Sequence, residues 1–246
     1  MWVKAKVLER RDWNRRLFSL KLSAGVTDFI AGQFIKLSIM RDDKRIARAY
    51  SLVNPPGRDY CEILAVAVNG GELSTHLQAL VAGDEIEMTV SAAGFMTLNE
   101  VPNGFKHLWL IATGTAVGPF ISMMLTAEPW QRFDKVVLVY GVRQVDDLAY
   151  LAELRALEQA YPQQFRLVIS VTREPFVGGL SCRIPQGLIA GEIEAQAGLT
   201  LNAADSQVML CGNPEMVKEA DIYLQSLGLT KNLRRAPGNI TLEKYW

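Results

Sequence analysis

The chain has 246 residues, of which 49% are apolar, and its 26 basic residues balance 26 acidic ones. Domains commonly hold about 100–200 residues, so this length allows one large domain or two smaller ones. A formal net charge of zero argues against a protein that binds nucleic acid through a strongly basic surface.

Cysteine and histidine are scarce. The three cysteines, Cys61, Cys182 and Cys211, are far apart, and His76 and His107 are the two histidines. These numbers argue against a disulfide framework, an iron–sulfur cluster and a histidine-rich metal site, so we expect no metal. The N-terminal segment carries charges where a signal peptide would be apolar, which predicts a cytoplasmic protein.

Residues 1–100 alternate between apolar and polar side chains with a period of two, which is typical of strands with one buried face. Glycine, aspartate and proline turns separate the strands, and one short helix is expected at 73–80. The pattern predicts an antiparallel β-barrel over residues 1–100. The expected strands are 3–7, 17–22, 34–39, 49–53, 63–68 and 85–90.

After residue 100, apolar strands alternate with helices, which predicts an α/β domain with a parallel sheet over residues 101–246. The apolar stretch 107–125 is long enough to cross a membrane, but two glycines and a proline interrupt it. We therefore expect a strand, a turn and a helix there, and no membrane span. The expected strands are 107–112, 136–140, 165–171 and 207–211, and the expected helices are 120–125, 147–160 and one that starts at Asn213.

The segment Arg48-Ala49-Tyr50-Ser51 belongs to a predicted strand. Alternate residues of a strand share a face, so Arg48 and Tyr50 point the same way. An aromatic ring can stack on a flavin, an arginine can bind a pyrophosphate, and a hydroxyl can hydrogen-bond the reactive flavin nitrogen. An ordinary barrel strand with a solvated arginine explains these four residues equally well.

Two glycine-rich turns precede predicted helices. Gly71 and the residues after it open the first helix, whose N-terminal amides form an anion site, although a plain capped turn is an alternative. The segment from Gly114 to Pro119 follows a buried strand, where ligands bind in open parallel sheets. It differs from the G-x-G-x-x-G pattern, and a tight turn without a ligand is the other interpretation.

Arginines follow the predicted ends of later strands: Arg143 and Arg173 directly, and Arg183 ten residues further on. Their donor forks suit phosphate, and without an acidic residue for the ribose they favour NADP over NAD. Each one alone is explained as a surface charge. Cys211 also follows a strand, but it has no nearby base, so we interpret it as a packing residue beside a reacting ring or in the core.

The order of these segments is more specific than any one of them. RAYS, GGELS, GTAVGP, YGVR, VTRE, CGNPEM and a terminal Tyr245-Trp246 follow one another along the chain. The whole chain thereby resembles the bacterial ferredoxin/flavodoxin–NADP(+) reductase family. The resemblance implies a barrel that binds FAD and an α/β domain that binds NADP(H). It also implies hydride exchange with NADP(H) and single-electron exchange with ferredoxin or flavodoxin.

The resemblance also assigns residues. Ser51, Tyr50, Cys211 and Tyr245 are implied next to the reacting rings. Plant-type members end on a tyrosine that stacks on the flavin, whereas this chain has one further aromatic, so the roles of Tyr245 and Trp246 stay open. The implied FAD residues are Arg48, Ala49, Tyr50, Ser51, Leu64, Ala65, Val66, Gly71, Glu72, Leu73, Ser74, Thr115, Tyr245 and Trp246. The implied NADP residues are Gly141, Val142, Arg143, Thr172, Arg173, Arg183, Cys211, Gly212 and Asn213.

Two other functions use the same scaffold: an NADPH-dependent free-flavin or quinone reductase, and a non-catalytic flavin electron-transfer subunit. The arginines and the lack of a cysteine cluster favour a self-contained enzyme, which we expect to be a monomer. Two basic groups are expected to attract an acidic ferredoxin or flavodoxin, with scattered solvated charges as the alternative. They are Lys4, Lys6, Arg10, Arg11, Arg15 and Arg16, and then Lys231, Arg234 and Arg235.

Overall fold

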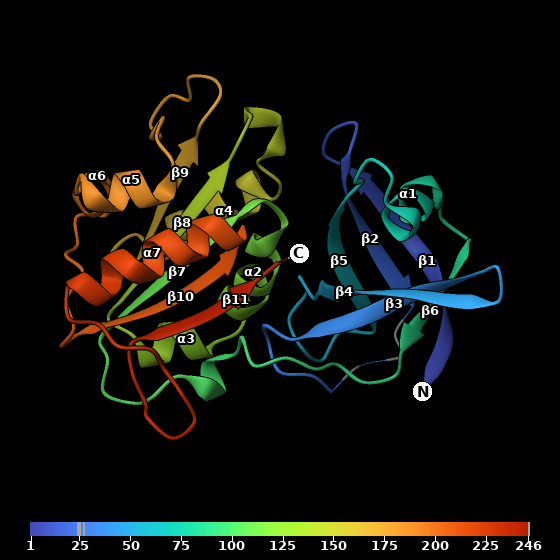
Figure 1. The fold of residues 1–246 in the computed structure, drawn as a ribbon, viewed down its shortest axis with the longest axis horizontal. Helices are drawn as coiled ribbons and strands as arrows, with labels where there is room; N and C mark the ends of the chain where they lie inside the picture. Colours follow the sequence, from blue (N-terminus) through green and yellow to red (C-terminus); the bar gives the residue numbers. More distant parts are fainter. Residues whose placement is uncertain (24–25, 27, 246) are drawn as a thin grey trace. The chain divides into compact units, whose positions relative to one another are not determined.

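The computed structural model describes residues 1–23, 26 and 28–245. The chain divides into two compact units (Figure 1). Unit 1 comprises Met1–Thr97 and Gly118–Thr126, and unit 2 comprises Leu98–Val117 and Ala127–Trp246. Among the described residues, no helix is both long and apolar enough to cross a bilayer.

Unit 1 is built on six antiparallel strands: β1 (Trp2–Asp12), β2 (Leu17–Ser23), β3 (Phe34–Arg41), β4 (Lys44–Ser51), β5 (Tyr60–Val66) and β6 (Glu85–Thr89). Their order in the sheet is β4-β3-β6-β1-β2-β5. The two outermost strands also approach each other, because Leu52 forms a bridge with Ile63 and the Val53 amide donates to the Glu62 carbonyl over 2.8 Å. This second contact nearly closes the sheet into a barrel, and the predicted antiparallel architecture is confirmed.

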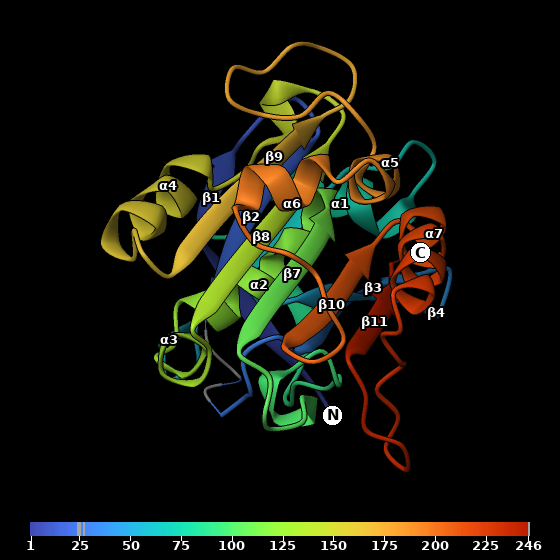
Figure 2. The ribbon, with the colours of Figure 1, turned by 90° about the vertical axis from the view of Figure 1, so that its left-hand side faces the viewer.

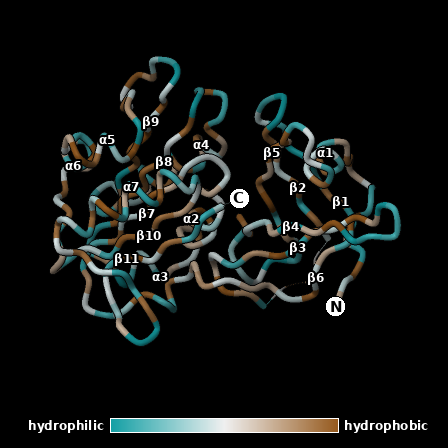
Figure 3. The backbone as a smooth tube through the Cα atoms, viewed as in Figure 1, coloured by the Kyte–Doolittle hydropathy of each residue, from teal (hydrophilic) through white to brown (hydrophobic). Residues whose placement is uncertain are grey.

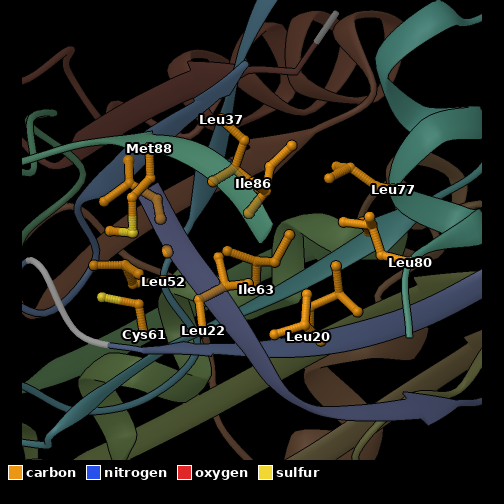
Figure 4. Packing of buried hydrophobic residues seen from close by; sticks show 14 of the residues in the cluster. Leu20, Leu22, Leu37, Leu52, Cys61, Ile63, Leu77, Leu80, Ile86 and Met88 are labelled. Carbon is orange, nitrogen blue, oxygen red and sulfur yellow. The ribbon is translucent and has the colours of Figure 1, made fainter. Parts of the chain in front are cut away.

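The period-two pattern explains the barrel core, since alternate side chains point inward. Leu20 and Leu22 of β2, Ile63 of β5 and Met88 of β6 are fully buried together (Figure 4). Helix α1 (Glu72–Ala79) adds Leu73 and Leu77 to the same cluster. Packing against the barrel therefore fixes the position of the helix that carries the glycine turn.

Helix α2 (Gly118–Met124) belongs to unit 1, although its neighbours in sequence belong to unit 2. The Ser122 hydroxyl donates to the Asn54 carbonyl over 2.7 Å. A Cβ placed on Gly118 would lie 3.3 Å from Val53, and one placed on Gly32 would lie 2.5 Å from Met123. The helix thus packs closely on the segment that follows β4.

Unit 2 holds a parallel sheet in the order β11-β10-β7-β8-β9 (Figure 2). Strands β7, β8, β9 and β10 are buried on both faces and carry apolar runs (Figure 3), as parallel strands usually do, whereas the edge strand β11 is mostly half-buried. Helices α5, α6 and α7 share one core cluster with strands β7, β8 and β10. The bounds are β7 (His107–Thr113), β8 (Lys135–Val142), β9 (Phe165–Val171), β10 (Ser206–Gly212), β11 (Ile240–Lys244), α3 (Glu128–Arg132), α4 (Leu151–Ala160), α5 (Ile184–Ile189), α6 (Glu192–Ala197), α7 (Pro214–Ser226) and the 3₁₀ turns η1 (Leu98–Glu100), η2 (Gly114–Val117) and η3 (Val145–Asp147).

Several elements differ from those predicted. Strand β4 starts at Lys44, before the expected 49–53, because Asp42 and Asp43 adopt φ of 49° and 58° and turn the chain tightly out of β3. Helix α4 starts at Leu151, after the expected 147, because Tyr150 has a left-handed φ of 57°. The sequence patterns also missed β11 and the short helices α3, α5 and α6.

Candidate functional site

Strand β4 presents the first candidate residues. Arg48 is exposed and Tyr50 is half-buried against the barrel core. The Arg48 guanidinium donates to the Ala47 carbonyl over 2.8 Å and forms no ion pair with an acidic residue in the described part of the chain. Burial raises the pKa of Tyr50 to about 12, and the charge of Arg48 opposes this shift. The strand therefore offers an available cation and a neutral aromatic ring.

Ala49 and Ser51 are the other two residues of this segment. In the register of β3 and β4, Lys36 pairs with Ala49 and Phe34 pairs with Ser51, the last residue of β4. Ala49 is exposed and Ser51 is half-buried. The serine thus lies where the strand leaves the sheet, one residue beyond Tyr50.

The glycine turn before α1 leaves the N-terminal amide groups of the helix accessible to a ligand. Gly70 has a φ of +75°, and no side chain caps the helix at Gly71. The Ser74 hydroxyl accepts from the Val68 amide over 3.1 Å, so it closes the turn itself. A Cβ on Gly71 would lie 2.5 Å from that hydroxyl oxygen, so a larger residue there would displace the Ser74 side chain. The first amides of α1 form an anion site.

Glu72 is the acidic residue in this first turn and would repel a phosphate. Its carboxylate is paired with Arg41 at 3.0 Å, and both side chains are about half exposed. Arg41 lies in the β3–β4 hairpin, which also carries Arg48. Arg41 therefore offsets the charge of Glu72, while Arg48 and the helix N-terminus are suited to a pyrophosphate, and these groups fit FAD.

Leu64, Ala65 and Val66 form the end of strand β5 and pair with Ser19, Phe18 and Leu17 of β2. Ala65 belongs to the barrel core, whereas Leu64 is buried outside that cluster. The predicted flavin-edge residues are thus part of a regular, rigid strand.

In unit 2 the ends of β7 and β10 are joined. The Thr113 hydroxyl accepts from the Asn213 amide over 2.9 Å. Gly212 has a φ of +131°, and a Cβ there would collide with the same hydroxyl oxygen. Asn213 in turn caps α7, since its side-chain oxygen accepts from the Glu215 amide over 2.9 Å. Thr115 follows on η2, so this edge gathers the predicted residues 115 and 211–213.

Cys211, Glu243 and Tyr245 form a cluster at the same edge. Cys211 is fully buried and pairs with Glu243 in the ladder between β10 and β11. Burial and then the nearby Glu243 carboxylate raise the pKa of the Cys211 thiol well above its ordinary value, while a hydrogen bond from Tyr245 opposes the shift. A thiol that stays neutral is a poor nucleophile.

Glu243 was missed by the sequence reasoning. Burial raises the pKa of its carboxyl group, and the Tyr245 amide close by donates to the Gly212 carbonyl over 2.9 Å. A half-buried carboxyl group beside a buried thiol is typical of a functional site. In the sequence, Glu243 could have been noticed because it lies two residues before Tyr245. Its place beside Cys211 depends on the pairing of β10 with β11, which the sequence did not reveal.

The predicted phosphate-binding arginines gather at the carboxyl ends of β8 and β9. The Thr172 amide donates to Val142 over 3.1 Å and the Arg173 amide donates to Arg143 over 2.9 Å. Arg183 is the N-cap residue of α5, where its backbone amide donates to the Gln186 side chain over 3.1 Å, and the chain reaches it after a bridge between Leu180 and Ser170 of β9. All three arginines are exposed, and among residues 1–23, 26 and 28–245 none of their guanidinium groups has an ion-pair partner.

Gly141 is the next-to-last residue of β8, and both it and Val142 are buried. A Cβ at this position would lie 2.8 Å from Ile184 of α5, so glycine allows the helix to pack against the strand end. Unpaired guanidinium groups at the carboxyl edge of a parallel sheet fit a nucleotide phosphate.

Both units match known families. Residues 3–96 match an oxidoreductase FAD-binding domain, and residues 110–221 match an oxidoreductase NAD-binding domain. The flavodoxin/ferredoxin–NADP reductase of Escherichia coli (strain K12) is 44% identical over 246 residues, covering 100% of this chain and 99% of the relative. This chain belongs to the flavodoxin/ferredoxin–NADP reductase family.

Other members of the flavodoxin/ferredoxin–NADP reductase family are more distant. The ferredoxin–NADP reductase of Azotobacter vinelandii is 32% identical over 249 residues, covering 97% of this chain and 95% of the relative. The crystal structure of a ferredoxin NADP+ reductase from Neisseria gonorrhoeae, with bound FAD and NADP, has a TM-score of 0.93 at 32% identity, covering 99% of this chain and 98% of that one. The family and fold predicted from the sequence are confirmed.

The four residues implied beside the reacting rings divide between the units of this reductase-family chain. Tyr50 and Ser51 are on β4 of unit 1, and Cys211 and Tyr245 are at the ends of β10 and β11 in unit 2. Trp246 lies outside the described residues. Within the part of the chain that the structure describes, no group of three histidine, cysteine, aspartate or glutamate side chains is placed to hold a metal ion.

Proposed function

We propose that this chain is a ferredoxin/flavodoxin–NADP(+) reductase that uses FAD. The observation that carries the proposal is the edge of three unpaired arginines in unit 2, combined in one chain with an FAD-binding barrel. Full-length identity of 44% with the Escherichia coli reductase supports it. When bound, FAD supplies the exchange between the two-electron nicotinamide and one-electron carriers.

In unit 1, Arg48 and the amides of Gly71–Ser74 are proposed to hold the FAD pyrophosphate. Tyr50 is proposed to stack on the flavin ring, because its phenol stays neutral and its ring is held by the barrel. Ser51 is proposed to hold a hydrogen bond to the reactive flavin nitrogen. The Leu64–Val66 strand is proposed to line the ring edge.

In unit 2, Arg143, Arg173 and Arg183 are proposed to bind the 2′-phosphate of NADP(H). Arginine is suited to this work because its fork of donors binds phosphate oxygens in pairs. The backbone of Gly141, Val142 and Thr172 is proposed to support binding of the same phosphate. We propose that Thr115 and the Cys211–Asn213 segment face the nicotinamide half, and that Tyr245 is an aromatic gate that moves before hydride transfer.

The partner is proposed to be an acidic ferredoxin or flavodoxin, and the enzyme a cytoplasmic monomer. Several basic residues expected to attract such a partner are already paired. Lys4 pairs with Glu85 at 2.9 Å, and Lys231 pairs with Asp221 at 3.0 Å. Electrostatic attraction of the acidic partner therefore depends on the remaining basic residues. Because salt screens such attraction, electron-transfer rates are expected to fall as ionic strength rises.

A visible spectrum tests the proposal. The purified protein is expected to show flavin absorbance that NADPH bleaches faster than NADH does. Single electrons are then expected to pass to added ferredoxin or flavodoxin. Rapid turnover with free FMN and none with either protein carrier would instead indicate a free-flavin reductase. A colourless protein that FAD cannot reconstitute would contradict the proposal.

A further inference from the structure

The chain segments that follow β8 and β9 remain hydrogen-bonded to each other at their first residues. The amides of Thr172 and Arg173 continue the ladder onto the carbonyls of Val142 and Arg143. The two arginines thus leave the sheet as neighbours, on loops whose separation decides whether both side chains reach one phosphate.

Glu174 makes the next connection between these loops. Its carboxylate accepts from the Val145 amide over 2.5 Å, across 29 residues of sequence. Val145 is the first residue of η3, and the amides at the start of a helical turn favour a negative charge. A side chain from the loop after β9 therefore caps the helical turn after β8.

The charge of Glu174 makes this position unusual. A carboxylate next to Arg173 in sequence repels a phosphate and could pair with the arginines. Within the described residues it forms no ion pair with Arg143 or Arg173, and its bond is to a backbone amide. Arg143 and Arg173 consequently remain available to bind a phosphate, although the acidic Glu174 directly follows Arg173.

We propose that Glu174 is a positioning residue for the 2′-phosphate grip, and that its bond to the Val145 amide sets the preference for NADPH over NADH. The inference rests on the proposed function, in which Arg143 and Arg173 bind that phosphate. Glu174 touches no phosphate in this role. Together with the backbone bond from Arg173 to Arg143, it fixes the distance between the two loops that carry the arginines.

The far end of the same loop is held separately. The Gln196 side chain donates to the Gly178 carbonyl over 2.6 Å, and the Leu180 amide donates to Ile169 over 2.8 Å. These bonds attach the loop to α6 and to β9. Loss of the Glu174 bond is therefore expected to loosen the arginine end and leave the rest of the loop in place.

Three variants distinguish whether Glu174 acts through its hydrogen bond to Val145 or through its negative charge. Glu174→Ala removes both the bond and the charge, whereas Glu174→Gln removes the charge and keeps an acceptor oxygen. Val145→Pro removes the donor and keeps the charge. Proline suits the first position of a helical turn, and Gln144 before it already has the extended φ of −128° and ψ of 158° that proline requires. Glu219→Ala, on an exposed residue of α7, is the control for net charge.

The readout is calorimetric binding of adenosine 2′,5′-bisphosphate and of AMP, followed by KM and kcat with NADPH and NADH. Glu174→Ala and Val145→Pro are each expected to weaken bisphosphate binding and raise KM for NADPH by about tenfold. AMP binding, KM for NADH and kcat should stay unchanged. Glu174→Gln and Glu219→Ala should behave like the parent. The double variant should be no worse than either single variant.

Opposite results overturn the inference. If Glu174 acts only through its charge, Glu174→Ala and Glu174→Gln will both bind the bisphosphate more tightly than the parent. Additive losses in the double variant would show that the two groups act separately. A parent protein that binds AMP and the bisphosphate equally would refute the proposed NADP site, and this inference with it. Retained selectivity in Glu174→Ala would refute the inference alone.

Discussion

At the end of β4, neighbouring residues carry separate tasks. Tyr50 contributes a ring supported by the barrel core, and its raised pKa keeps the hydroxyl neutral at any physiological pH. Ser51 contributes a small hydroxyl at the strand end. Stacking tolerates small shifts of a ring, whereas a hydrogen bond depends on one donor at one distance.

Ser51→Ala is therefore expected to slow flavin reduction by NADPH by about 100-fold, the usual effect of removing one donor beside a reacting atom. Single-turnover absorbance measures that rate, and the FAD content of the purified protein should be unchanged. Ser226→Ala, at the end of α7, is the control. An unaltered rate in Ser51→Ala would remove Ser51 from the proposed mechanism.

Glu243 has a pH-dependent effect on stability. Burial raises the pKa of its carboxyl group in the folded chain, so folding favours the protonated form. Stability therefore falls as the pH rises from the unfolded-state pKa through the folded-state pKa. Glu243→Gln is expected to be more stable than the parent at pH 7, and the two should converge below about pH 4. Thermal unfolding over a pH series measures the difference in stability between Glu243→Gln and the parent. A difference that does not change with pH would contradict the role of the Glu243 pKa.

Among the elements, α1 depends on the β1–β2 hairpin for its position. The Arg10 guanidinium donates to the Gln78 carbonyl over 2.6 Å and to the Leu80 carbonyl over 3.1 Å, at the C-terminal end of α1. Arg16 donates to the Ala67 carbonyl over 3.1 Å, just before the glycine turn. One hairpin thus holds the chain on both sides of the Gly71–Ser74 segment proposed to bind the pyrophosphate.

Arg10→Met is expected to lower the free energy of unfolding by about 1–3 kcal/mol, because it leaves carbonyl groups of a mostly buried bond network unpaired. FAD affinity should fall with it, measured by titrating the apoprotein. Lys4→Met is the matched control from the same strand: its pair with Glu85 is exposed on both sides and should contribute little. Equal effects of both substitutions would argue against the hairpin's role.

The strands of both sheets could be predicted because burial imposes a period on their sequences. Strand β11 could not, since Ile240–Lys244 is short, half polar and ordered by pairing with β10. Helices of five or six residues owe their stability to packing, which no local pattern reports. The segments proposed to bind the cofactors could be picked out because glycine turns and arginines lie close in sequence to strand ends, whereas Glu243 and Glu174 contact partners far along the chain.

At the scale of the whole molecule, unit 1 is not one continuous stretch of sequence. Residues 1–97 need Gly118–Thr126 to be complete, and α2 covers the segment after β4 through Asn54 and Val53. The sequence pattern placed a boundary near residue 100, where asparagine, proline and glycine cluster, because composition reports a linker but gives no sign of a returning helix.

A fragment of residues 1–100 is accordingly expected to bind FAD poorly and to unfold at a lower temperature than unit 1 in the intact chain. A second, matched fragment joins residues 1–97 to 118–126 through a flexible linker and should recover part of both properties. Circular dichroism melting and FAD titration compare the two. Equal behaviour of the two fragments would mean that α2 is dispensable for unit 1.

The returning helix also has a consequence for synthesis. Because the ribosome releases the chain from its N-terminus, the first unit stays unfinished until residue 126 has emerged, by which time the first strand of the second unit has been made. The first unit is therefore completed only after part of the second has been made. A gene that exchanged the flavin half for another by fusion at residue 100 would therefore inherit a barrel without its last helix.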